Sequence, residues 1–308
     1  RLVGILPAAT RVLFVGDTGQ LPPIGAGLVF HALSDTAVPF FHLSQVQRQD
    51  EQSGIHRFAM SVRNALPEIP PDTKATLAES ADCTIESNAD IGRLIDLWND
   101  AGGAKRCIVL SPIRKGELGV TNINLALQHA SDASRPSLHY QDPLRGWIPW
   151  VTESGARLLL GDRVLVTANN YVQDADLRNG DLGVVSDAFQ APSNTDGAVG
   201  MLEVNGLDVR ITPDLVEKLD LGYAVTIHKA QGSQWPTCFV MLPTEAKQMA
   251  DRSLVYTAAT RPRERLVLMG NADLIEAAVR RGASASMRET CLTARLLSLL
   301  DVESVGAA

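Results

Sequence analysis

The apolar positions of this chain follow two kinds of pattern, and the first is that of buried strands alternating with helices. Residues 12–15 form a continuous apolar run closed by Gly16-Asp17, which is typical of a parallel strand buried on both faces that ends at a functional loop. Ser53 can cap a helix whose apolar residues recur at helical spacing as far as Leu66. Residues 67–72 then have the composition of a linker, and we place a domain boundary there.

A second α/β unit follows this linker and is interrupted by a stretch with the other pattern. It begins with an amphipathic helix around residues 91–98 and a strand at 107–110 that ends at Ser111-Pro112. Short β-rich runs with turn signals then take over, at 163–167, 182–185, 200–204 and 207–211. Asn205-Gly206 between the last two runs predicts a type I′ hairpin, because both residues tolerate positive φ. We therefore expect a small barrel here.

The α/β pattern returns after residue 221, so the barrel is predicted to be an insertion. Strands are expected at 224–227, 238–242 and 265–269, with helices between them. The sequence thus predicts an α/β protein in three parts. The first unit covers 1–70, the second covers 71–150 with 220–308, and the insertion covers 151–219.

Composition agrees with a globular protein and narrows the possible ligands. The chain has 308 residues, of which 45% are hydrophobic and 20% charged, which excludes disorder, collagen-like repeats and a coiled-coil rod. Its net charge of −7 means that any nucleic-acid binding must use a local groove. No apolar run is long enough for a membrane span and no signal segment opens the chain, so a cytoplasmic enzyme without a membrane partner is expected. The four cysteines are scattered and near apolar residues, which predicts reduced core thiols.

The first candidate for chemistry is the loop that begins at Gly16. It reads Gly16-Asp-Thr-Gly-Gln-Leu-Pro-Pro and follows a predicted buried strand, at the sheet edge where α/β proteins bind ligands. The amide of Gln20 both donates and accepts hydrogen bonds, so it can contact a terminal phosphate or an attacking water. A Gly- and Pro-rich connection without function is the alternative interpretation.

Two arginines are candidates for stabilising a transferring phosphoryl group. Arg48 follows a short apolar strand candidate, and Arg261 stands at the end of a helix that Pro262 terminates. A permanently charged planar guanidinium suits this task, and such arginines are often supplied by a different element from the phosphate loop. Each could equally be a structural or solvated arginine.

Two further polar segments follow predicted strands. Thr226-Ile-His-Lys-Ala-Gln-Gly-Ser offers hydroxyl, imidazole and backbone N–H groups, which can hold phosphates without reading bases. Ser111-Pro-Ile-Arg-Lys, followed by Asn122, is a second such loop with two cations. A structural histidine at His228 and a solvated turn after Ser111 are the alternatives.

Taken in order, these strings resemble the later motifs of superfamily 1 helicases, and above all those of RecD-like helicases. The resemblance covers most of the chain and rests on six strings, namely Gly16-Asp-Thr-Gly-Gln-Leu-Pro-Pro, Val46-Gln-Arg-Gln, Ser111-Pro-Ile-Arg-Lys, Asn179-Gly-Asp-Leu-Gly, Thr226-Ile-His-Lys-Ala-Gln-Gly-Ser and Val255-Tyr-Thr-Ala-Ala-Thr-Arg. It implies RecA-like motor domains of the P-loop NTPase type, one partial and one complete. The inserted β-rich stretch would then be a small SH3-like β-barrel.

The resemblance also implies a function and assigns residues to it. The intact protein would be an ATP-dependent 5′ to 3′ DNA helicase or translocase in recombination and repair, possibly alongside other subunits of a recombination nuclease. ATP would be held by residues that include Gln20, Arg48, Gly232, Gln234 and Arg261. Single-stranded DNA would be contacted by Ser111, Arg114, Asn122, Thr226 and His228.

The chain departs from the family pattern in ways that change what is expected of it. It contains no G-x-x-x-x-G-K-S/T phosphate loop and no Asp-Glu pair on a strand before Arg11, and the family carries both upstream of the Gly16 loop. We therefore expect a C-terminal fragment that hydrolyses no ATP alone and whose Mg²⁺ ligands lie upstream. Gln234 stands where relatives commonly have Glu, and Pro262 where they usually have a small residue.

Two other functions stay open on the sequence. A degenerate motor half could hold nucleic acid or a repair partner without catalysis. An RNA helicase of the same superfamily is also compatible, because phosphate and stacking contacts do not by themselves distinguish the two sugars.

Overall fold

The structure is a computed structural model of residues 1–308. It describes the whole chain except residues 1, 8, 26, 37, 44–52, 66–79, 132–133, 143, 171–175, 194, 289 and 306–308. Arg48 and the proposed boundary at 67–72 lie outside the described residues.

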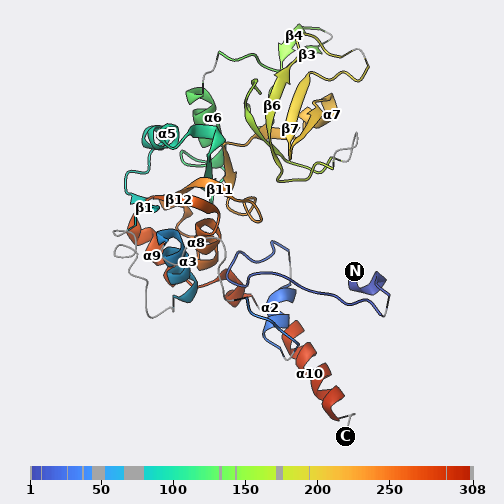
Figure 1. The fold of residues 1–308 in the computed structure, drawn as a ribbon, viewed down its shortest axis with the longest axis vertical. Coiled ribbons are helices and arrows are strands. Elements are labelled where there is room, and N and C mark those ends of the chain that lie inside the picture. The colour runs from blue at the N-terminus through green and yellow to red at the C-terminus, as the bar shows by residue number, and fades with distance from the viewer. Residues whose placement is uncertain are drawn as a thin grey trace.

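A five-stranded parallel sheet forms the centre of the α/β part of the molecule (Figure 1). Its strands lie in the order β1-β12-β11-β2-β10. Their bounds are β1 Cys83–Glu86, β2 Cys107–Ser111, β10 Ala224–Thr226, β11 Trp235–Met241 and β12 Pro262–Met269. The strands predicted at 107–110, 224–227, 238–242 and 265–269 are confirmed, whereas β1 was not predicted. Every residue of β2 is buried, as expected for a central parallel strand covered on both faces.

Helices cover both faces of this sheet. Successive side chains of a strand point to opposite faces, so neighbouring residues of β2 belong to different hydrophobic cores. Cys107 and Val109 of β2 face the helices α5 (Ile91–Asp100) and α6 (Val120–Ala130). Ile108 and Leu110 face the opposite core, which contains residues of α3 (Gly54–Asn64), α8 (Arg252–Ala259) and α9 (Ala272–Arg280). Short 3₁₀ turns, η1 Gly103–Lys105, η2 Thr244–Ala246 and η3 Ser284–Met287, complete the connections.

Helix α3 begins as the sequence predicts but packs on the sheet of the second unit. The hydroxyl of Ser53 accepts a hydrogen bond from the backbone N–H of His56, so Ser53 is the N-cap. Ile55, Phe58 and Val62 are buried in the same core as α8 and β12. The range 1–70 therefore includes a helix that lies with the second unit, next to α8 (Figure 1).

The β-rich stretch between α6 and β10 forms an antiparallel sheet in the order β8-β7-β6-β5-β9. These strands are β5 Arg163–Val166, β6 Leu182–Ala188, β7 Gly200–Val204, β8 Leu207–Arg210 and β9 Leu219–Leu221. A separate hairpin, β3 His139–Asp142 with β4 Gly146–Pro149, and the short helix α7 (Pro213–Val216) accompany them. Asn205 and Gly206 have φ values of 53° and 77°, which confirms the predicted hairpin turn with two positive φ angles.

A buried network of hydrogen bonds connects this inserted sheet to the α/β part of the molecule. Asp162, just before β5, is fully buried and accepts hydrogen bonds from Arg135 at 2.8 Å and from the Tyr223 hydroxyl at 2.9 Å. The amide of Gln128 on α6 also donates to it. Burial raises the pKa of Asp162, and the donors around it oppose that rise. Asp162 is therefore the junction between α6, the inserted sheet and the approach to β10.

The predicted strand at 12–15 is wrong in this structure. These residues have no regular secondary structure, and Leu13 and Val15 are 84% and 82% exposed. A buried parallel strand needs neighbouring strands for its hydrogen bonds, and none lies beside it among the described residues. The segment instead leads into a lobe with α2 (Val29–Ser34) and α10 (Leu292–Val305), which pack on each other below the sheet in Figure 1, while α1 (Leu2–Ile5) opens the chain.

The cysteines agree with the prediction except for one. Cys83, Cys107 and Cys238 are buried, and burial raises the pKa of Cys107 to about 11. Cys291 is exposed, because it lies just before α10 rather than in a core. Within the part of the chain that the structure describes, no helix is long and apolar enough to cross a membrane.

Candidate functional site

The loop that carries Gln20 lies directly on helix α8, more than two hundred residues away in the sequence. The backbone N–H of Leu21 donates to the Thr257 hydroxyl at 2.8 Å, and the Tyr256 hydroxyl donates to the Asp17 carboxylate at 3.1 Å. The amide of Gln231 donates to the Leu21 carbonyl at 2.9 Å. The first predicted phosphate-facing loop and the helix that leads to Arg261 are thus joined by hydrogen bonds.

Asp17 gives this loop its shape. Its carboxylate accepts from the Gly19 backbone N–H at 3.0 Å and from the Gln20 amide at 3.3 Å, and its carbonyl accepts from the Gln20 backbone N–H at 3.2 Å. A Cβ at Gly19 would lie 3.0 Å from the Tyr256 ring, so glycine permits the close approach to α8. Gln20 is half-buried, with its amide directed by Asp17.

Arg261 is held against the end of its own helix. Its side chain is buried, with the residue only 3% exposed. The guanidinium donates to the carbonyls of Thr257 at 2.9 Å and Ser233 at 3.3 Å, and to the Thr260 hydroxyl at 2.8 Å. These hydrogen bonds hold the Arg261 guanidinium at the connection between α8 and β12.

The segment around Gly232 completes this group. Gly232 has a φ of +85° with open space around it, a conformation that favours glycine. The carbonyl oxygen of the Gln234 side chain accepts from Arg263 at 3.3 Å. The structure therefore brings together four of the five residues assigned to ATP, namely Gln20, Gly232, Gln234 and Arg261, in three neighbouring segments.

The residues assigned to single-stranded DNA come from two neighbouring strand ends. β2 and β10 pair in parallel with Thr226 opposite Ser111, so the loops that follow them start side by side. Ser111 itself is fully buried and its hydroxyl donates to the Leu118 carbonyl at 2.9 Å. In this structure the Ser111 hydroxyl holds the loop that follows β2, and its assignment as a DNA contact stays a prediction.

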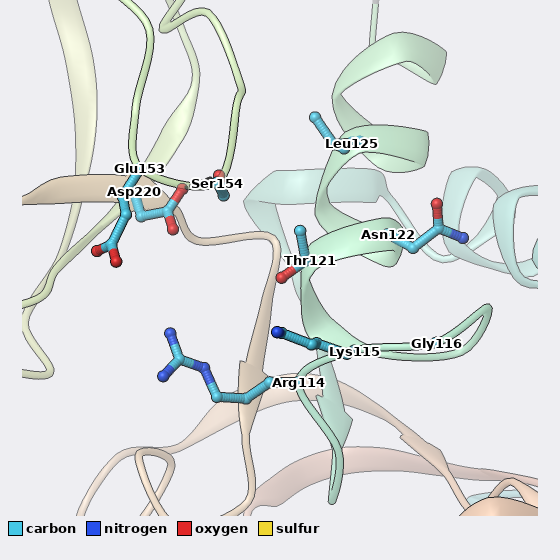
Figure 2. Close-up of a pocket in the computed structure, with 9 residues that line it drawn as sticks. All are labelled: Arg114, Lys115, Gly116, Thr121, Asn122, Leu125, Glu153, Ser154 and Asp220. Atoms are coloured by element: carbon cyan, nitrogen blue, oxygen red, sulfur yellow. Dashed lines mark hydrogen bonds between the residues drawn. The ribbon is translucent and has the colours of Figure 1, made fainter.

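Arg114 and its neighbours line two adjoining cavities between this edge and the inserted sheet. A cavity of about 600 Å³ is lined by Arg114, Lys115 and Asn122 on one side and by Glu153 and Asp220 on the other (Figure 2). A smaller one of about 100 Å³ is lined by residues that include Arg114, Thr226 and Lys229. Asn122 donates to the Glu117 carbonyl at 2.7 Å and so holds the loop. His228 is half-buried beside Lys229 and lines neither cavity.

Among the residues of these cavities, sequence reasoning gave no role to Lys229, Glu153 and Asp220. Lys229 stands next to His228 in a motif that we had singled out, and burial together with Arg114 lowers its pKa, partly opposed by Asp220. Its position in the motif was a signal that could have identified it. Glu153 precedes β5 and Asp220 lies in β9 of the antiparallel sheet, and no sequence pattern places that sheet against the Arg114 loop.

The donor sets suit phosphate oxygens rather than a metal ion. The Gln20 amide and the Arg261 guanidinium are hydrogen-bond donors, as a nucleotide phosphate requires. Across the described residues, no group of three or more His, Cys, Asp or Glu side chains could hold a metal ion. These donors are compatible with the predicted phosphate contacts, which stay a prediction.

Comparison with known proteins identifies the class. The family model for the UvrD-like helicase C-terminal domain matches residues 221–269, and that for the AAA domain matches residues 1–78. The crystal structure of the Pif1 helicase from Candida albicans superposes with a TM-score of 0.51 at 18% identity, over 85% of this chain and 65% of that one. Together with the parallel sheet, these likenesses define a RecA-like α/β fold of the helicase type.

Relatives in sequence show which helicases this chain resembles. The ATP-dependent RecD2 DNA helicase of Deinococcus radiodurans is 34% identical over 96% of this chain and 37% of its own length. The RecBCD enzyme subunit RecD of Mycobacterium tuberculosis strain H37Rv is 27% identical over 97% of this chain and 51% of its own length. The chain thus spans between about a third and a half of these relatives. Over the part that it spans, the chain is similar in sequence to RecD-like helicases, and its residues 221–269 match the UvrD-like helicase C-terminal domain.

Proposed function

We propose that these residues serve an ATP-dependent DNA helicase or translocase that moves 5′ to 3′ along single-stranded DNA in recombination and repair. The observation that carries the proposal is the hydrogen bond from Leu21 to Thr257, which joins the Gln20 loop to the helix of Arg261. A motor must link the groups that sense a terminal phosphate to the units that grip the strand. The amide of Gln231 extends this contact toward the strand, because it donates to the Leu21 carbonyl from the segment that also carries Thr226 and His228.

Gln20 and Arg261 would hold the terminal phosphate of ATP, with Gly232 and Gln234 beside them. Bound ATP would supply the phosphoanhydride bond whose hydrolysis drives movement. Arg261 would leave its bonds to Thr257 and Ser233 to stabilise charge on the phosphoryl group. Arg48 is proposed for the same site, and Mg²⁺ ligands are proposed to lie in a segment upstream.

The strand of DNA would run along the ends of β2 and β10. Arg114, Lys115 and Lys229 offer cations there, and Thr226 offers a hydroxyl beside them. His228, next to Lys229 in the chain, is proposed to contact the strand outside the two cavities. Glu153 and Asp220 form the opposite wall and would repel phosphates, so the backbone of the strand is proposed to follow the cationic wall (Figure 2). A few local contacts of this kind are compatible with a net charge of −7.

The finer features of the proposal concern the whole protein. The inserted antiparallel sheet is proposed to be an SH3-like barrel, and the division into 1–70, 71–150 with 220–308, and 151–219 is retained as a proposal. Action in the cytoplasm would suit the reduced, buried thiols. Other subunits of a recombination nuclease are proposed partners, because one relative is named as a RecBCD subunit.

One observation favours the alternative of a binding module without catalysis. The guanidinium of Arg261 is already bonded to three groups, as a purely structural arginine would be. A module of this kind would bind single-stranded DNA without any effect of ATP on its affinity.

The test is ATP hydrolysis by the full-length gene product, measured with and without single-stranded oligonucleotides of DNA and of RNA. Stimulation by DNA and much weaker stimulation by RNA supports the proposal. Equal or stronger stimulation by RNA supports an RNA helicase. Tight DNA binding without hydrolysis supports the binding module.

A further inference from the structure

Three side chains from three distant segments meet at the Gln20 loop. Arg63 of α3 lies 3.2 Å from one oxygen of Asp17, and the hydroxyl of Tyr256 lies 3.1 Å from the other. Arg63 also donates to the Tyr256 hydroxyl at 3.0 Å, and its guanidinium lies 5.6 Å from the centre of the Tyr256 ring. The three groups form a closed triangle, in which each one contacts the other two.

The three side chains of this triangle are buried or partly buried, so solvent competes only weakly for their hydrogen bonds. Tyr256 is only 6% exposed, and burial raises its pKa, so its hydroxyl keeps the proton that it donates to Asp17. Arg63 and Asp17 are partly buried. The Gly19 backbone lies close against the Tyr256 ring, and a Cβ at Gly19 would lie only 3.0 Å from the ring.

We propose that Tyr256 and Arg63 are positioning residues for Gln20. They fix both oxygens of Asp17, and Asp17 in turn accepts from the Gln20 amide and from the Gly19 backbone. The direction of the Gln20 amide is thereby set by α3 and α8, so that movement of α8 is transmitted to the loop. This inference rests on the proposed function, because it gives Tyr256 and Arg63 a part in ATP hydrolysis.

The experiment uses the full-length gene product and removes one contact at a time. Tyr256→Phe deletes only the hydroxyl, and Arg63→Gln deletes the charge. The matched controls are Tyr140→Phe in the β3–β4 hairpin and Arg57→Gln, an exposed arginine on the same helix α3. The readouts are kcat and KM for ATP at saturating single-stranded DNA, DNA affinity without nucleotide, melting temperature, and hydrogen exchange of the peptide containing residues 17–21.

The inference predicts that both variants lower kcat by about 10-fold or more, since small misplacements of a catalytic group are costly. DNA affinity without nucleotide should match the controls, exchange at 17–21 should rise, and Arg63→Lys should recover part of kcat. Unchanged kcat with only a lower melting temperature would show a structural role and overturn the inference.

The two proposals fail in different ways. If the wild-type protein shows no DNA-stimulated ATP hydrolysis, the proposed function is wrong, and so is the catalytic part of the inference. In that case exchange at 17–21 still decides whether Tyr256 and Arg63 hold the loop. If the wild-type protein hydrolyses ATP and the Tyr256 and Arg63 variants have the same kcat, only the inference is wrong.

Discussion

At the scale of single residues, the cationic wall beside β2 and β10 depends most on Lys229 and Arg114. Both side chains line the smaller cavity, one from each strand-end loop. Burial and the neighbouring Arg114 lower the pKa of Lys229. Both effects make the charged form of Lys229 less favourable when no anion is bound. A phosphate placed between the two side chains would remove that cost, which makes Lys229 the residue to test first.

Lys229→Ala is expected to weaken binding of single-stranded DNA and to reduce its dependence on salt. Each lost phosphate contact lowers the slope of log K against log salt by about 0.7 for single strands. Affinity measured by fluorescence anisotropy over a range of salt concentrations gives this slope, with the exposed Lys247→Ala as control. A slope equal to that of the control would remove Lys229 from the DNA path.

At the scale of elements, the attachment of α3 depends on a carboxylate outside the helix. Asp82, just before β1, accepts from the Ser53 hydroxyl at 2.6 Å and from the Gly54 backbone N–H at 3.0 Å. It thus satisfies donors at the start of a helix that carries Arg63. Burial alone would raise the pKa of Asp82, but these hydrogen bonds, with one from Ser80, lower it overall.

Asp82→Asn is expected to destabilise the protein near neutral pH by about 1 kcal/mol, the typical value of a helix cap. Because the pKa of Asp82 is lower in the folded state, its contribution is present above the unfolded pKa of about 3.9 and is lost as pH falls through the folded pKa. Urea unfolding at pH 6 and at lower pH should show the difference from wild type shrinking with acid. The exposed Asp208→Asn is the control, and a difference that is independent of pH would contradict the assignment.

Elements with strong local signals were predictable, and those that depend on distant partners were not. The apolar run of β2 and the turn at Asn205-Gly206 are encoded by neighbouring residues. Residues 12–15 carry the same apolar signal, yet no neighbouring strand pairs with them among the described residues. In the candidate site, the motifs predicted roles for Gln20 and Arg261, and the structure places their segments next to each other. The burial of Ser111 and the bonds that engage Arg261 are tertiary outcomes that the motif strings do not contain.

At the scale of the whole molecule, the position of the inserted sheet depends on the buried network around Asp162. Arg135, Tyr223 and Gln128 direct donors at this one carboxylate from both sides of the junction. Because Asp220 lies in β9 of this sheet, we expect the same junction to influence how Asp220 and Glu153 face the Arg114 loop. The geometry of the larger cavity therefore depends on a network that lies outside it.

Arg135→Gln is expected to lower the free energy of unfolding by about 3 kcal/mol, because it leaves a buried carboxylate without its charged partner. Thermal or denaturant unfolding measures the loss. Arg145→Gln in the β3–β4 hairpin serves as the control, since Arg145 is exposed. A loss no greater than that of the control would mean that Asp162 is neutral in the folded protein.

The central claim is that the contact between the Gln20 loop and helix α8 is part of an ATP site in a DNA-dependent motor. The direct measurement is DNA-stimulated ATP turnover by the full-length gene product carrying Gln20→Ala or Arg261→Lys. Lysine lacks the planar fork of arginine, so the account predicts a fall of about 10³-fold for Arg261→Lys and a large fall for Gln20→Ala, with DNA affinity without nucleotide unchanged. Turnover equal to wild type in both variants would contradict it.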